Sequence, residues 1–226
     1  MLFRSKIKIN LNYLFTFFMG KTYLVHFNGY FCAVKKPINI VLLISGNGSN
    51  ARNLVVSLAA NPDLSIQGII SNNGNAAMET YCAENQLFFK VFHPWSESSA
   101  LLFCKSQEID VVVLAGFLRK ISGDFISAFP LGIINIHPSL LPNYSGKGMY
   151  GHHVHQAVWD NNEDKTGITI HLVNEQYDDG EILLQQSCDI TDCSSPIEIE
   201  QRVRALEHHF FPLAVAQYCS RLERES

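Results

Sequence analysis

The stretch that decides the fold is Ile38-Asn39-Ile40-Val41-Leu42-Leu43-Ile44, followed by Ser45-Gly46-Asn47-Gly48-Ser49. The first seven residues are almost wholly apolar, which is typical of a strand buried on both faces of a sheet. The next five form a glycine turn, after which Leu54, Val55 and Leu58 follow a helical spacing. A buried strand, a glycine turn and a helix predict the start of a parallel α/β sheet.

The same alternation continues along the chain. Apolar runs predict further strands at 65–71, 87–91, 110–114 and 132–136. Helical patterns at 50–60, 76–85 and 98–107 separate the strands from 38–44 to 110–114. After residue 165 the apolar and polar residues alternate at 166–173 and 181–187, which predicts later strands with antiparallel pairing. We therefore predict a Rossmann-like α/β fold: an open, mostly parallel twisted sheet with helices on both faces and antiparallel pairing near the C-terminal end.

The chain ends in a predicted helix with one apolar stripe. The stripe consists of Ile199, Val203, Leu206, Phe210 and Leu213. Pro212 lacks a backbone N–H, so we expect it to kink or split this helix.

Composition and charge favour one domain that acts on small molecules. The chain has 226 residues, 47% of them hydrophobic, which suits a single α/β core. A formal net charge of −4 gives no global field for nucleic acid. The six cysteines form no Cys-x-x-Cys pair, so we interpret them as small buried residues in a reducing compartment and expect no metal.

The N-terminal 36 residues differ from the rest. Three basic residues precede a short apolar run at 11–18, which resembles a signal peptide, but Asn12 interrupts the run and no cleavage site follows. We expect residues 1–36 to be a disordered extension or a misassigned translation start, and residues 37–226 to form a single domain. The run is too short to span a bilayer, so we expect a cytoplasmic protein without membrane contact, as a monomer or homodimer.

The glycine turn predicts an anion site. Its backbone amides open a helix, whose N-terminus favours phosphate, and Ser49 and Asn50 add side-chain donors. The turn also fits a dinucleotide fingerprint, but the acid that such a site needs is replaced by Ser71-Asn72-Asn73. We interpret the turn as a monophosphate cradle, with a turn that binds nothing as the alternative.

Asn135 and His137 are the strongest catalytic candidates. They lie two apart at the end of an apolar strand, so they point to the same side and reach the sheet edge where α/β folds place ligands. Together they can donate hydrogen bonds to one developing oxyanion. Asp178, in a loop between two predicted strands, is a candidate for holding the imidazole and favouring its charged form, although an Asp-Asp-Gly turn is also ordinary loop chemistry.

Other histidines have weaker functional signals. His171 lies inside a predicted strand, where a structural role is expected. His152, His153 and His155 follow the glycine-rich loop 146–151, and we expect them at the surface or at a helix start. That loop has a composition that would let it move over the site.

These motifs together resemble a known family. The segments 44–50, 113–119, 135–142 and 167–171, with Glu207-His208, are similar to the folate-dependent formyltransferases, specifically the phosphoribosylglycinamide formyltransferase family, over about residues 39–219. The resemblance implies transfer of a formyl group from 10-formyltetrahydrofolate to the amine of glycinamide ribonucleotide, in purine biosynthesis. It implies no metal.

The resemblance also implies residue roles. Asn135, His137 and Asp178 would form the catalytic trio. The ribonucleotide would be bound by Gly48, Ser49, Asn50 and Glu207, with residues just before Glu207. The folate would be bound by Leu118, Arg119, Lys120, Ile121, Asn135, Asn174, Glu175, Gln176, Tyr177 and Asp178. The sequence Tyr177-Asp178-Asp179-Gly180 has an aspartate where the family usually has a second glycine, and Asp178 is the better aligned acid.

Three other activities remain as alternatives. A formyltetrahydrofolate deformylase uses a similar trio but delivers the formyl group to water, and it carries a regulatory domain that residues 1–36 are too short to supply. A methionyl-tRNA formyltransferase needs an added basic domain. A dinucleotide-dependent oxidoreductase would need an acidic residue where this chain has Ser71-Asn72-Asn73.

Overall fold

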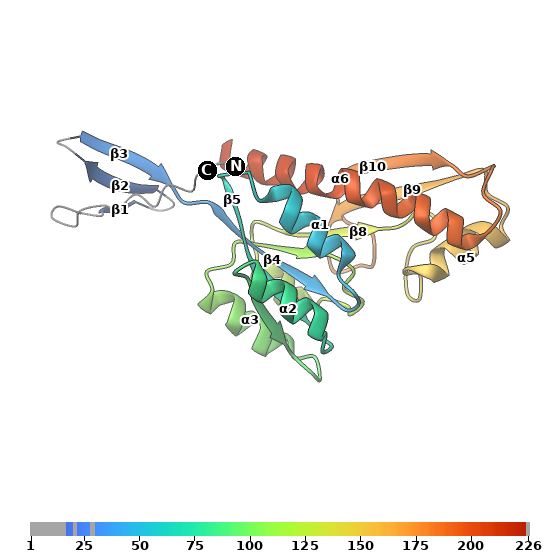
Figure 1. Cartoon of the computed structure of the whole chain (residues 1–226), viewed down its shortest axis with the longest axis horizontal. Coiled ribbons are helices and arrows are strands. Elements are labelled where there is room, and N and C mark those ends of the chain that lie inside the picture. Colours follow the sequence, from blue (N-terminus) through green and yellow to red (C-terminus); the bar gives the residue numbers. More distant parts are fainter. Residues whose placement is uncertain (1–16, 20–21, 28–29, 225–226) are drawn as a thin grey trace. The chain divides into compact units, whose positions relative to one another are not determined.

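The chain divides into two compact units, Met1–Pro37 and Ile38–Ser226 (Figure 1). The computed structural model describes residues 17–19, 22–27 and 30–224. In the first unit, β1 (Phe17–Met19), β2 (Thr22–Phe27) and β3 (Tyr30–Lys35) form an antiparallel sheet in that order. Residues 1–16, 20–21 and 28–29 of the expected extension 1–36 lie outside the described residues.

Removing this unit tests whether the second one is sufficient. The seven strands and six helices described below all lie within Ile38–Arg224, and the first unit contributes no strand to their sheet. A chain that begins at Lys36 is therefore expected to stay folded and to keep full activity. Thermal melting and an activity assay of the two chain lengths check this. A large loss of stability or activity on truncation would show that residues 1–35 contribute to one or the other.

The second unit contains one seven-stranded sheet in the order β10-β9-β8-β7-β4-β5-β6. Its parallel strands are β4 (Ile38–Ile44), β5 (Leu64–Ser71), β6 (Phe88–Val91), β7 (Val111–Leu114) and β8 (Ile133–His137). Two further strands, β9 (Lys165–Leu172) and β10 (Ile182–Asp189), extend the sheet with antiparallel pairing. The predicted fold class is confirmed.

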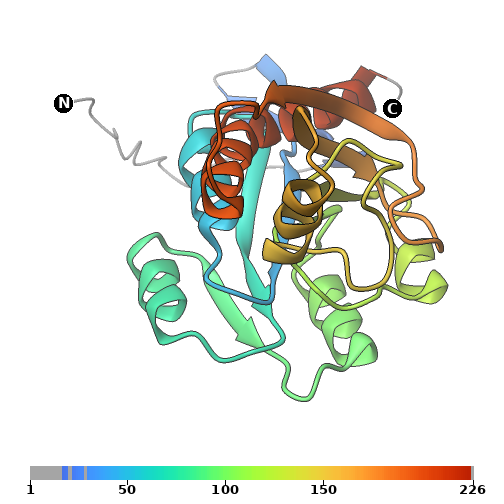
Figure 2. The ribbon, with the colours of Figure 1, turned by 90° about the vertical axis from the view of Figure 1, so that its right-hand side faces the viewer.

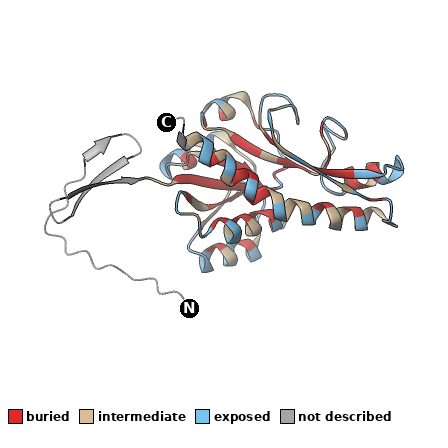
Figure 3. Ribbon diagram, turned by 90° about the horizontal axis from the view of Figure 1, so that it is seen from above, coloured by how far each residue is buried: buried red, intermediate tan, exposed pale blue. Residues whose placement is uncertain are grey.

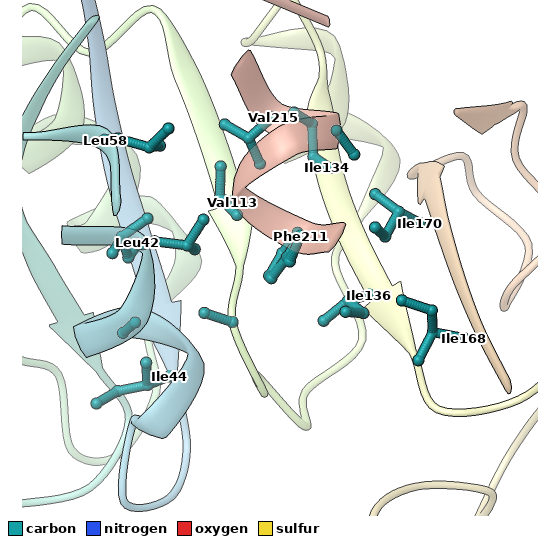
Figure 4. Close-up of a cluster of buried hydrophobic side chains, with 14 of the residues drawn as sticks. Leu42, Ile44, Leu58, Val113, Ile134, Ile136, Ile168, Ile170, Phe211 and Val215 are labelled. Carbon is teal, nitrogen blue, oxygen red and sulfur yellow. The ribbon is translucent and has the colours of Figure 1, made fainter. Parts of the chain in front are cut away.

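The central strand β4 is buried on both faces, as its composition predicted. Ile40, Leu42 and Ile44 contribute to one hydrophobic cluster, and the alternating residues Val41 and Leu43 contribute to another. Figure 3 shows the strands of this sheet mostly buried, and Figure 4 shows Leu42 and Ile44 in the cluster that Phe211 and Val215 of the last helix complete. Burial on both sides explains why the strand contains almost no polar residue.

Six helices accompany the sheet (Figure 2). They are α1 (Ser49–Leu58), α2 (Ala76–Glu84), α3 (Glu97–Ser106), α4 (Gly123–Ser127), α5 (His152–Asp160) and α6 (Pro196–Arg224). Helices α1 and α5 both pack against α6. These three helices therefore form a connected layer, in which α1 and α6 also pack against strands of the sheet.

The prediction that Pro212 splits the last helix is wrong, because α6 is one helix of 29 residues with Pro212 inside it. Pro212 cannot donate to the carbonyl of His208, four residues earlier. That carbonyl instead accepts a hydrogen bond from the Asn53 side chain of α1, at 2.7 Å. A side chain from the neighbouring helix thus replaces the missing backbone donor.

The predicted apolar stripe of α6 is correct except at its last residue, because Leu206 and Phe210 are partly buried against the same core. Ile199 and Val203 are buried, but Leu213 is 46% exposed. Phe211 and Val215 are buried instead, which moves the buried stripe by about one residue past Phe210. The spacing in the sequence allowed both registers, and packing against the sheet selects the second.

Candidate active site

The carboxyl ends of β4, β7 and β8 lead into one cavity of about 470 Å³. The chain runs from β4 outward to β5 and β6 and then returns to β7 on the other side of β4. Ligands of open α/β sheets bind beside such a reversal of strand order. The loops there are tied together, because the Ser45 amide donates to the Gly116 carbonyl and the Leu118 amide donates to the Ser45 hydroxyl.

His137, at the end of β8, is buried and held from two sides. Its Nε2 is 2.8 Å from the Tyr144 carbonyl oxygen, which can only accept, so Nε2 carries a hydrogen. Its Nδ1 lies 3.6 Å from Oδ1 of Asp178. The nitrogen left for a substrate is therefore Nδ1, which lies beside the Asp178 carboxylate.

Asp178 is fixed by its backbone and by a second hydrogen bond. Its φ of 54° places it in the left-handed region, which Asp tolerates better than most residues. Its Oδ2 accepts from the backbone amide of Gly146 at 3.0 Å, which joins the aspartate to the glycine-rich loop. The neighbouring Asp179 is exposed and is 3.4 Å from the Asn174 amide nitrogen instead.

Asn135 is oriented by His171. The two residues are partners in the β8–β9 register, and Asn135 Nδ2 lies 3.1 Å from His171 Nε2. Nδ1 of His171 donates to the Leu172 carbonyl at 2.8 Å, and burial lowers the pKa of His171, so the ring is neutral and Nε2 accepts. The amide nitrogen of Asn135 thus uses one hydrogen on His171 and keeps the other. The expected structural role of His171 fits these bonds.

The glycine turn opens α1 without a side-chain cap and without an acidic residue in the first turn. Its amides are therefore left for an anion. Asn50 donates from Nδ2 to Oε2 of Glu207 at 2.9 Å, which joins α1 to α6. Burial raises the pKa of Glu207, and the bond from Asn50 opposes that shift.

Fourteen of the predicted site residues line this one cavity. They are Ser49, Asn50, Leu118, Arg119, Lys120, Ile121, Asn135, His137, Asn174, Glu175, Gln176, Tyr177, Asp178 and, from α6, Glu207. Leu118 is 54% exposed and Tyr177 48% exposed, so two large apolar side chains lie at the cavity without cover. Lys120 places its ammonium 5.3 Å from the centre of the Tyr177 ring.

Gly48 is the predicted site residue that does not line the cavity. It precedes α1 with φ of 70°, a conformation that glycine adopts without strain. A Cβ there would collide with the Met78 methyl group of α2 and approach Ile44. Gly48 therefore determines the conformation of the turn without lining the cavity.

Valine at Gly48 is expected to damage the turn and, with it, the phosphate site that the sequence predicts there. The left-handed conformation alone costs an L-residue roughly 1–2 kcal/mol, and the collision with Met78 adds to it. Gly48→Val should lower the melting temperature and raise KM for the ribonucleotide more than KM for the folate. Steady-state kinetics with each substrate varied separately check this, and equal rises in both KM values would indicate general misfolding.

Several cavity residues were not predicted from the sequence. Glu200 and Arg204 of α6 line the cavity with Glu207, at helical spacings of four and three, and Arg204 pairs with Glu200. His155 was expected at the surface or at a helix start; it lies in the first turn of α5, but it is 3% exposed and also lines the cavity. The helical spacing upstream of Glu207 was the signal that could have found the first two.

Two absences concern the described residues alone. In that part of the chain, no helix is both long enough and apolar enough to cross a membrane. The same residues contain no group of three or more His, Cys, Asp or Glu side chains arranged to hold a metal ion.

Comparison with known proteins assigns the chain to a family. The formyl transferase profile matches residues 38–215, which is the whole sheet and most of α6. The chain belongs to the formyl transferase family. The resemblance noted in the motifs is thus confirmed, and membership of a transferase family with it.

Named relatives and solved structures agree with this assignment. The chain is 32% identical over 189 residues to the phosphoribosylglycinamide formyltransferase of Escherichia coli, covering 80% of this chain and 87% of that protein. It is 33% identical to the chloroplastic enzyme of that name from Arabidopsis thaliana, of which it spans 65%. A crystal structure of phosphoribosylglycinamide formyltransferase from Brucella melitensis matches with a TM-score of 0.73 and 31% identity, over 81% of this chain and 96% of that one.

Proposed function

We propose that this member of the family transfers the formyl group of 10-formyltetrahydrofolate to the amine of glycinamide ribonucleotide, in purine biosynthesis. The observation that carries the proposal is that His137, Asp178 and Asn135 meet in one cavity with the uncapped start of α1. The E. coli and B. melitensis proteins named for this activity support the choice of substrates. Cytoplasmic location follows from the same proposal as an expectation.

The proposed reaction forms one C–N bond and breaks another. The neutral amine attacks the formyl carbon, a new C–N bond forms, and the C–N bond to the folate nitrogen breaks. Negative charge develops on the formyl oxygen, where the remaining Asn135 N–H and protonated His137 Nδ1 donate hydrogen bonds. The proton lost by the amine is accepted by the departing folate nitrogen, with Asp178 assisting through water.

Different parts of the cavity lining offer surfaces that suit the two substrates. The exposed Leu118 and Tyr177 side chains offer apolar surface for the flat ring of a folate. The opposite wall combines the α1 amides, which suit a phosphate, with Glu207, which can accept from sugar hydroxyl groups. Holding both substrates in one cavity allows direct transfer in a ternary complex.

The decisive experiment measures the fate of the formyl group with and without the ribonucleotide. Under the proposal, product and tetrahydrofolate form only when glycinamide ribonucleotide is present. Formate release in its absence would favour the deformylase instead. Thermal shifts with glycinamide ribonucleotide, free folate and NAD separate these from an oxidoreductase, for which NAD alone would stabilise the protein.

A further inference from the structure

The first turn of α5 carries a histidine whose surroundings do not fit a purely structural role. His155 lies between the core residues Val154 and Val158, where an apolar side chain would pack without cost. Its Nδ1 is sealed from solvent and has no hydrogen-bond partner. Buried polar atoms without partners are costly, and native proteins keep few of them without a functional reason.

The other ring nitrogen of His155 is available to a ligand. No hydrogen bond to Nε2 is found among the described residues, and unlike Nδ1 it is not sealed from solvent. The side chain lines the cavity that holds His137. A molecule in that cavity can therefore reach Nε2.

The neighbours of His155 indicate which end of the cavity it serves. Glu200 and Arg204 of α6 lie close enough to His155 to act on its charge, and so does His137. Glu200 and Arg204 share their helix face with Glu207, the partner of Asn50 at the start of α1. His155 thus lies near both His137 and the α6 residues Glu200 and Arg204, which line the cavity with Glu207.

The starts of the helices point to the same kind of ligand. Helices α1 and α5 both follow a glycine, and both lack a side-chain cap and an acidic first turn. By contrast, α2, α3 and α4 have a capping side chain and an acidic residue, respectively Asn75 and Glu79, Ser96 and Glu97, and Ser122 and Asp124. The two uncapped starts are the ones that line the cavity. The first-turn amides of α1 favour an oxygen-rich, negatively charged ligand. At α5 the amides of His153 and Val154 donate to the carbonyls of Tyr150 and Gly151, so α5 contributes the His155 side chain to the cavity.

We propose that His155 is a specificity residue for the ribonucleotide, and that its Nε2–H donates a hydrogen bond to an oxygen of the ribose 5-phosphate part. The ring acts as a neutral donor, because burial lowers the pKa of His155 to about 4. The inference rests on the proposed function, since it assigns one more contact in the same site. It gives α5 a binding role beside α1 and α6.

The test uses a variant that replaces the imidazole by a flat aromatic ring without nitrogen atoms. For His155→Phe, calorimetry should show Kd for glycinamide ribonucleotide, and for ribose 5-phosphate alone, raised about 5- to 10-fold, the loss expected for one hydrogen bond. Kd for the folate and kcat should stay unchanged. The melting temperature should not fall, because the substitution also removes an unpartnered buried atom.

Two further variants make the result specific. His155→Gln retains an N–H donor and should recover part of the ribonucleotide affinity. Gln156→Ala is the control on the same helix, because Gln156 does not line the cavity and bonds to Asp160 instead. It should bind both substrates as the unmodified protein does.

Three outcomes would contradict the inference. Unchanged ribonucleotide binding in His155→Phe would refute it while leaving the proposed function in place. Equal losses for both substrates with a lower melting temperature would show that His155 only supports packing. Failure of the unmodified protein to bind the ribonucleotide would overturn the proposed function, and the inference with it.

Discussion

Replacing His137 by alanine is expected to lower kcat by roughly 10²–10³, the usual loss when one donor to a developing oxyanion is removed. The loss should fall on kcat more than on either KM, because the hydrogen bond is made as the charge develops. The reason lies in the geometry: Nε2 is held by the Tyr144 carbonyl, and Nδ1 faces Asp178 and the cavity. Steady-state kinetics with both substrates saturating measure the effect.

Folding must be separated from chemistry in this variant. His137 is 4% exposed, so alanine leaves a void and an unpaired Tyr144 carbonyl. His137→Asn fills more of the space and keeps a donor but cannot form an imidazolium. His209→Ala, at an exposed position of α6 outside the cavity, is the matched control and should be fully active. Near-normal turnover by a folded His137→Ala protein would remove His137 from the catalytic trio.

The second large effect is expected at Asp178. Asparagine keeps the size of the side chain and tolerates the left-handed backbone at this position, but it removes the negative charge beside Nδ1 of His137. Asp178→Asn is therefore expected to lower kcat by about 10² or more, within the range typical of lost acid–base groups. Folate binding should change less, since the backbone of this loop is kept. Rates with native-like melting temperatures check the result.

The adjacent aspartate provides the control. Asp179 is exposed and faces Asn174 rather than His137, so Asp179→Asn should have a mild effect. If both substitutions cause small and similar losses, the two aspartates only stabilise a turn. If Asp179→Asn is the inactive one, the residue carried over from the family motif is the wrong one of the pair.

The sheet could be predicted from the sequence because its strands are buried on both faces. The run Ile38–Ile44 has only one polar residue, and both core clusters require that. Helix α4 was not predicted, because five residues are too few to show a helical period, and for α5 only a helix start near its histidines was expected. Their existence depends on tertiary contacts, such as the packing of α5 against α6.

The candidate site was predictable where it follows strand ends and unpredictable where it depends on contacts across the fold. Asn135 and His137 follow from the period of a strand, and the cavity contains both. The sequence does not show that His171 orients Asn135, or that the Tyr144 carbonyl selects the proton position on His137. These bonds join residues that only the pairing of β8 with β9 and the course of the following loop bring together.

The bond from Asn53 to the His208 carbonyl has a consequence for how the protein unfolds. A proline inside a helix is usually a place where one half can fray independently of the other. Here the freed carbonyl is held by α1, and α1 also contacts α6 through Asn50 and Glu207. Helix α1 and the two halves of α6 therefore form one cooperative unit, and a ribonucleotide bound against the Asn50–Glu207 pair would make local opening of that unit rarer along the whole length of α6.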